Sequence, residues 1–228
     1  MKRHGFLPSS TFVTTCATLL FLVGTSGVTA AAQPPAVSSS AAARELDAFA
    51  RAIAGVDKYS ATVSIFDQKG AETQNVVFDY QFRKPSNVTV HVISGPNTGI
   101  TLSWTGGDTI IAHRGSGLIA MFSKTVSLHD PLVTTLQGAS IDQLSFGAIL
   151  ARAQQEAGRL SLVPSGVIDG VPANALTLVP AAPSAGLTRE VVEMSATTHL
   201  PMRVLGYDGS TIVSNIGFSN IKLQVEGD

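Results

Sequence analysis

Apolar and polar side chains alternate along residues 73–122, and this stretch constrains the fold more than any other. Within residues 100–105 (ITLSWT), every apolar residue is followed by a hydroxyl residue. Because successive side chains of a β-strand point to opposite faces, such alternation predicts strands with one apolar face. Clusters of Gly, Pro, Asn and Ser, typical of turns, separate the runs at residues 84–86, 95–97, 106–107 and 115–117. The stretch therefore predicts an antiparallel meander whose apolar face is covered by a packed core, a bound lipid or a partner protein.

Alternating runs on both sides of this meander extend the predicted sheet. Residues 59–66 precede it, and Asp208-Gly209 forms a strong hairpin signal near the end of the chain. The later candidate strands are residues 160–163, 174–179, 187–195, 202–207, 211–216 and 221–225. About ten or eleven strands in one antiparallel sheet are enough for the sheet to curl.

Two segments carry helical signals. In residues 41–56 the apolar residues recur at the spacing of one helix face. In residues 131–157, Pro131 predicts a short first helix that stops at Gly138, and the capping-box pattern from Ser140 predicts a second. The expected fold is therefore α+β: an unclosed antiparallel β-barrel with an N-terminal helix and a helical lid inserted mid-chain.

The N-terminus has the layout of a signal peptide. A short basic head precedes an apolar stretch at residues 12–23, and small residues suit cleavage after Ala30 or Ala32. We expect residues 1–30 to be a signal peptide, 31–40 a flexible leader and 41–228 the folded domain. Cys16 is the single cysteine and lies in the apolar stretch, so the mature chain would contain no cysteine. Export without disulfides favours the bacterial periplasm.

Composition indicates a folded core and argues against nucleic acid. Hydrophobic residues make up 44% of the chain and charged residues 14%, which suits a sizeable core. The formal charge is −1, and losing two basic residues with the signal peptide makes it about −3. No basic stripe is available to neutralise phosphates.

No constellation of catalytic residues is visible. The chain has no G-x-S-x-G elbow, and residues 113–117 lack the phosphate-loop pattern. No close pair of metal ligands is formed by the histidines of the expected mature chain, which are His91, His113, His129 and His199. We therefore expect no enzyme, no metal and no cofactor.

The apolar sheet face is the remaining candidate site. A single curled sheet with few helices can leave part of its concave side unfilled, and an acyl chain gains about 0.8 kcal/mol for each CH₂ buried there. Any single apolar residue of the stripe can equally be ordinary core. The residues expected to line the cavity are Phe78, Tyr80, Phe82, Val90, Val92, Leu102 and Trp104.

Three phrases and the order of elements resemble the periplasmic outer-membrane lipoprotein-carrier (LolA-like) superfamily. The phrases are residues 82–87 (FRKPSN), residues 104–109 (WTGGDT) and the tail at residues 190–223. The likeness spans about residues 44–225. It implies an unclosed β-barrel with a helical lid over an apolar cavity that takes lipoprotein acyl chains.

The resemblance also implies a latch. In the carriers an arginine just before the strand-opening proline holds the lid through hydrogen bonds to its backbone. The matching position here is Lys84, with Arg83 beside it. Lysine can donate to carbonyls but lacks the planar fork of arginine.

The resemblance and the apolar face together indicate a periplasmic protein that shields lipid or lipoprotein acyl chains. The alternative is an envelope protein-interaction or stress-sensing module on the same fold without lipid transport. We expect a monomer whose partners are acyl chains or an envelope protein, with transient contact to a membrane surface.

Overall fold

The computed structural model describes residues 39–115, 123–180 and 186–225. The signal peptide and most of the leader predicted from the sequence lie outside these residues. In the described part of the chain, no helix combines the length and the apolar character needed to cross a membrane.

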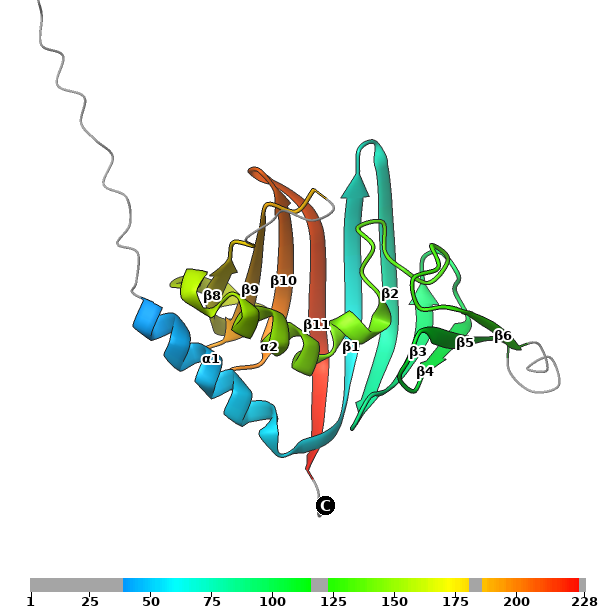
Figure 1. Ribbon diagram of the computed structural model, residues 1–228, viewed down its shortest axis with the longest axis horizontal. Coiled ribbons are helices and arrows are strands. Elements are labelled where there is room, and N and C mark those ends of the chain that lie inside the picture. The colour runs from blue at the N-terminus through cyan, green and yellow to red at the C-terminus, as the bar shows by residue number, and fades with distance from the viewer. Residues whose placement is uncertain (1–38, 116–122, 181–185, 226–228) are drawn as a thin grey trace, which may run out of the picture. The chain divides into compact units, whose positions relative to one another are not determined.

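The described strands form a single antiparallel sheet (Figure 1). Its eleven strands follow the order β6-β5-β4-β3-β2-β1-β11-β10-β9-β8-β7. The first half comprises β1 (Val56–Lys69), β2 (Glu72–Arg83), β3 (Asn87–Ser94), β4 (Ile100–Trp104), β5 (Thr109–Arg114) and β6 (Ser123–Ser127). The second half comprises β7 (Ser161–Ile168), β8 (Val171–Leu178), β9 (Arg189–Ser195), β10 (Pro201–Asp208) and β11 (Thr211–Val225).

Two meanders, β1–β6 and β7–β11, meet where β1 pairs with β11. The end strands β6 and β7 are not paired with each other, so the curled sheet stays open. The α+β fold with an unclosed antiparallel sheet, predicted from the alternation, is confirmed.

Two α-helices lie against the half of the sheet that contains β7–β11 (Figure 1). They are α1 (Ser39–Ala54) and α2 (Phe146–Gln155), and α1 contacts both α2 and β7. The first helix predicted over residues 41–56 is present, but it begins earlier, at Ser39, and ends earlier, at Ala54. It cannot reach residue 56, because Val56 already pairs with Val225 in the sheet.

The helix predicted over residues 131–157 is wrong in its first part. Residues 130–140 form turns, which we call the strap, and the one-turn 3₁₀ helix η2 (Ile141–Leu144) follows. The Gln143 side chain accepts from the Ser140 amide, as the capping box predicts, but Ser145 is the residue that caps α2, through the Ala148 amide at 3.1 Å. A second one-turn helix, η3 (Ala157–Arg159), follows α2.

Tertiary hydrogen bonds explain why the strap is not helical. The Leu136 amide donates to Gln74 Oε1 at 3.2 Å, and the Gln137 amide donates to Asp67 Oδ2 at 3.1 Å. In a helix these amides would donate to backbone carbonyls one turn earlier. The strap is instead fastened to β1 and β2.

The core lies between the helices and the inner face of the sheet. Phe146, at the start of α2, is 1% exposed and stacks on Tyr59 with ring centroids 4.4 Å apart. Its other neighbour is Phe218 of β11, in an edge contact at 5.6 Å. Burial of a phenylalanine side chain contributes about 1.5–3 kcal/mol, so this cluster fixes α2 on the β1–β11 seam.

Candidate functional site

An apolar pocket of about 260 Å³ lies on the inner face of the first meander, under the strap. Strands β1–β6 supply its floor, η2 one wall and the strap its roof. Apolar side chains of the floor are Ile65, Val76, Phe78, Val90, Val92, Ile100, Leu102, Ala112 and Val126.

Strand register explains why these side chains share one face. Val90 lies opposite Leu102, Leu102 opposite Ala112, and Ala112 opposite Lys124, which gives one cross-strand row over β3–β6. Directly opposite residues of neighbouring strands point to the same face. The strict alternation of the sequence therefore becomes a continuous apolar floor.

The strap closes the pocket from above with side chains of mixed character. Val133, Thr134 and Thr135 border the pocket, as does Leu132, whose side chain is 63% exposed. Near this end the Asn97 side chain donates to the Leu132 carbonyl at 3.2 Å. The other end of the strap is held by more hydrogen bonds, through the buried Asp67 and the half-buried Gln74 described above.

Four of the seven residues expected to line a cavity border this pocket: Phe78, Val90, Val92 and Leu102. Tyr80, Phe82 and Trp104 are not among the residues that border it. Trp104 is half-buried and donates its indole N–H to the Gly107 carbonyl at 2.8 Å. Phe82 stacks on Tyr59 with ring centroids 5.2 Å apart.

Tyr59 and Tyr80 hold the η2–α2 junction against the sheet, beside the pocket. The Tyr80 hydroxyl donates to the Ile141 carbonyl at 3.2 Å, and Tyr59 Oη accepts from the Phe146 amide at 2.9 Å. Burial raises the pKa of both phenols well above the ordinary value, so both remain neutral hydroxyls. This junction fills the part of the inner face next to Tyr80 and Phe82, and the pocket is the part left open.

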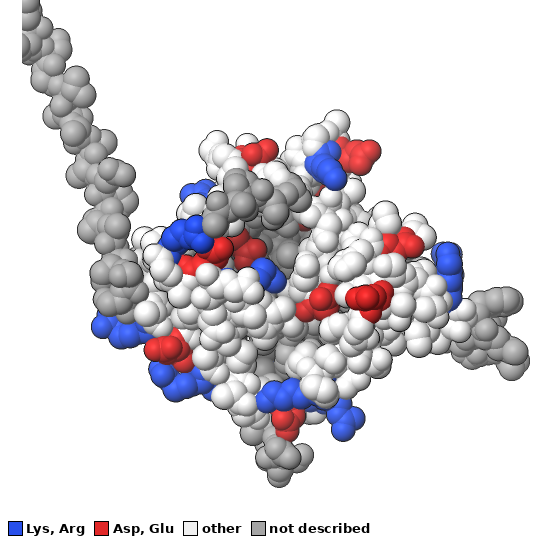
Figure 2. Space-filling model, viewed as in Figure 1, with Lys and Arg blue, Asp and Glu red and all other residues white. Residues whose placement is uncertain are grey.

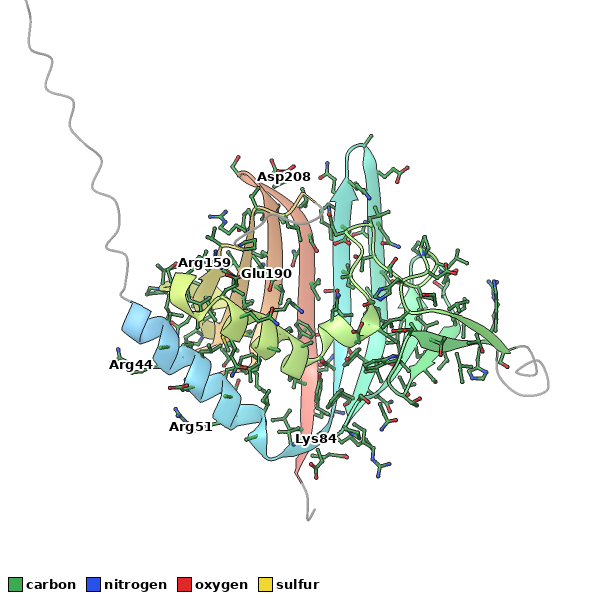
Figure 3. The ribbon with its side chains drawn as sticks, viewed as in Figure 1. Arg44, Arg51, Lys84, Arg159, Glu190 and Asp208 are labelled. Carbon is green, nitrogen blue, oxygen red and sulfur yellow. The ribbon has the colours of Figure 1, made fainter. Side chains whose placement is uncertain are left out.

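Lys84 contacts the end of α1. Its Nζ donates to the Ala54 carbonyl at 2.9 Å and lies 3.6 Å from Asp57 Oδ1. In Figure 3, Lys84 lies beside the C-terminal end of α1, whereas Arg44 and Arg51 project from the helix away from the sheet. The Arg83 side chain is exposed on β2, opposite Lys58 and Asn87.

Sequence reasoning missed part of the pocket although the signal was present. Ile100 and Ala112 follow the same alternation as Leu102, and Arg114 and Lys124 continue the pattern of β5 and β6. The strap carried no such signal, because its place over the pocket depends on contacts that are distant in sequence.

No candidate metal centre is found in the described residues. Across residues 39–115, 123–180 and 186–225, no group of three His, Cys, Asp or Glu side chains is placed to hold a metal ion. On the face seen in Figure 2, Lys and Arg lie in several small groups interspersed with Asp and Glu, without a continuous basic stripe.

No family model and no curated protein matches the chain. Solved structures of similar fold include an uncharacterized conserved protein from Thermus thermophilus, with 11% identity, a TM-score of 0.49, and coverage of 81% of this chain and 88% of that one.

Another is the Mycobacterium tuberculosis lipoprotein LppX, with 17% identity, a TM-score of 0.44, and coverage of 84% and 100%. A third is a LolA superfamily protein from Nitrosomonas europaea, with 15% identity, a TM-score of 0.40, and coverage of 80% and 93%. At these identities the likeness concerns the fold alone. The superfamily that the sequence resembles is the one named for this third structure.

Proposed function

We propose that this protein binds one acyl chain of a lipid or lipoprotein in the pocket under the strap and shields it from water in the periplasm. The apolar floor on the concave face carries the proposal, because an acyl chain needs apolar area and little polar recognition. Each CH₂ moved from water into such a pocket contributes about 0.8 kcal/mol.

The size of the pocket favours a single chain. Small-molecule sites commonly measure about 300–1,000 Å³, and this pocket of about 260 Å³ lies just below that range. Because the strap forms the roof, its movement would widen the pocket for entry and release. The end held by Asn97 has fewer hydrogen bonds to the sheet than the end held by Asp67, Gln68 and Gln74.

Native mass spectrometry of the full chain, expressed with its leader and purified without detergent, tests the proposal. We expect a bound species with the mass of a single-chain lipid, and displacement of that species by a fluorescent fatty acid. Protein that carries no lipid and binds no fatty acid would reject acyl-chain shielding. Recovery of an envelope protein in the same preparation would then favour the interaction module.

Filling the pocket should weaken binding of the acyl chain. Ala112 borders the pocket on β5, and Ala112→Trp would place an indole where the acyl chain is proposed to lie. We expect the dissociation constant of a fluorescent fatty acid to rise more than tenfold, or about 1.4 kcal/mol. The matched control is Ile111→Trp, since Ile111 is 44% exposed and lies on the opposite face of the same strand. Equal binding by both variants would contradict this location.

We also propose Lys84, rather than the neighbouring Arg83, as the latch on α1. Lys84→Met keeps the aliphatic stem and removes the donor to the Ala54 carbonyl. Because the contact is partly exposed, we expect a loss of only about 0.5–1 kcal/mol in the free energy of unfolding. Arg83→Met is the control and should change it by less than about 0.5 kcal/mol. Urea unfolding of both variants measures the difference, and a larger effect at Arg83 would assign the latch to that residue.

A further inference from the structure

One end of the pocket is cationic. On the inner face of β5, Arg114 comes after Ile110 and Ala112. On the neighbouring antiparallel strand β6, Lys124 comes before Val126, so both cations lie toward the same end of the pocket. Lys124 lies opposite Ala112, and Arg114 lies opposite Ile100, so both cations belong to the face that carries the apolar floor. Both residues border the pocket and are exposed to solvent.

No carboxylate balances these two charges within the pocket. The described residues that border it include Arg114 and Lys124 and contain neither Asp nor Glu. Among the ion pairs of residues 39–115, 123–180 and 186–225, none involves either cation. The potential at this end of the pocket is therefore positive, next to low-dielectric apolar walls that strengthen it.

The rest of the pocket is apolar, and so the ligand it fits is amphipathic. From the cationic end, the floor continues through Ile100 and Leu102 toward Val92 and Phe78. A molecule placed along it would meet charge at one end and hydrocarbon along its remaining length.

We propose that Arg114 and Lys124 hold the anionic headgroup of a single-chain lipid whose tail lies along the apolar floor. The headgroup is a carboxylate or a phosphate, since guanidinium and ammonium groups both donate charge-assisted hydrogen bonds to such oxygens. This inference rests on the proposed acyl-chain binding and adds the ligand class. Because both cations are exposed and screened by salt, the headgroup adds a moderate preference rather than most of the affinity.

Three probes with the same twelve-carbon tail test the headgroup: dodecanoate, dodecyl phosphate and dodecanol. Each probe is titrated into the full chain at pH 8 and low salt, below the concentration at which it aggregates. The dissociation constants of the two anionic probes should be about five- to tenfold lower than that of dodecanol. In R114Q/K124Q, the anionic probes should bind no more tightly than dodecanol, while dodecanol binds as it does to the unmodified protein. A salt concentration of about 1 M should also reduce the preference.

The matched control is K58Q/K69Q. It removes the same charge from two exposed residues of β1 that do not border the pocket, and it should keep the preference. Equal binding of all three probes to the unmodified protein, or a preference that survives in R114Q/K124Q, would overturn the headgroup assignment while acyl-chain binding stands. Failure of all three probes to bind would instead reject the proposed function. A difference between dodecanoate and dodecyl phosphate identifies which anion the site prefers.

Discussion

Phe146→Ala should lower the free energy of unfolding by about 3–5 kcal/mol, the range for deleting a buried aromatic ring. The ring is 1% exposed, stacks on Tyr59 and meets Phe218 edge-on. Its loss would leave a cavity where α2 joins β1 and β11. Tyr59 is held in place beside that cavity, because its Oη accepts a hydrogen bond from the residue-146 amide.

Urea unfolding followed by circular dichroism measures this loss. Leu132→Ala is the control, since it also removes an apolar side chain from the mid-chain segment but at a position that is 63% exposed. We expect the control to change the free energy of unfolding by less than about 0.5 kcal/mol. A loss below about 1.5 kcal/mol for Phe146→Ala would mean that the aromatic cluster does not hold α2.

Asp67→Ala is the second substitution from which we expect a large effect. Asp67 is fully buried and accepts hydrogen bonds from the Ser214 hydroxyl at 2.6 Å and the Gln137 amide at 3.1 Å. Each buried donor left without a partner costs about 1–3 kcal/mol. The variant should therefore lose about 2–4 kcal/mol and release one end of the strap.

Two measurements separate these consequences. Urea unfolding reports the global loss, and hydrogen exchange reports the strap, where the Gln137 amide should exchange much faster. Asp79→Ala is the control, because the Asp79 carboxylate is exposed and its contact with Thr62 is long, at 3.4 Å. Unchanged exchange at Gln137 in Asp67→Ala would show that the strap is held by other contacts.

The strands could be predicted from the sequence because alternation is a local signal. It placed Phe78, Val90, Val92 and Leu102 on one face, and strand register then brings them together. Tyr80 and Phe82 carry the same signal, yet the η2–α2 junction covers their part of the face. Which rows of an apolar face are covered depends on packing between distant segments, and alternation contains no information about that.

The strap could not be predicted for a related reason. Asp130 and Pro131 are good local signals for a helix start, and Asp130 Oδ1 does accept from the Leu132 amide at 2.9 Å. The Leu136 and Gln137 amides, however, donate to side chains 62 and 70 residues away in sequence. Long-range hydrogen bonds outweighed local propensity here.

The sheet cannot finish folding until β1 pairs with β11. This pairing joins the first strand of the sheet to the last, and the Ser214–Asp67 bond across it spans 147 residues. Contacts of such high sequence separation form slowly, since the loop entropy must be lost before they are made. Until β11 docks, one edge of β1 is bare and able to pair with other chains. Folding chains are therefore open to edge-to-edge association until the final strand docks.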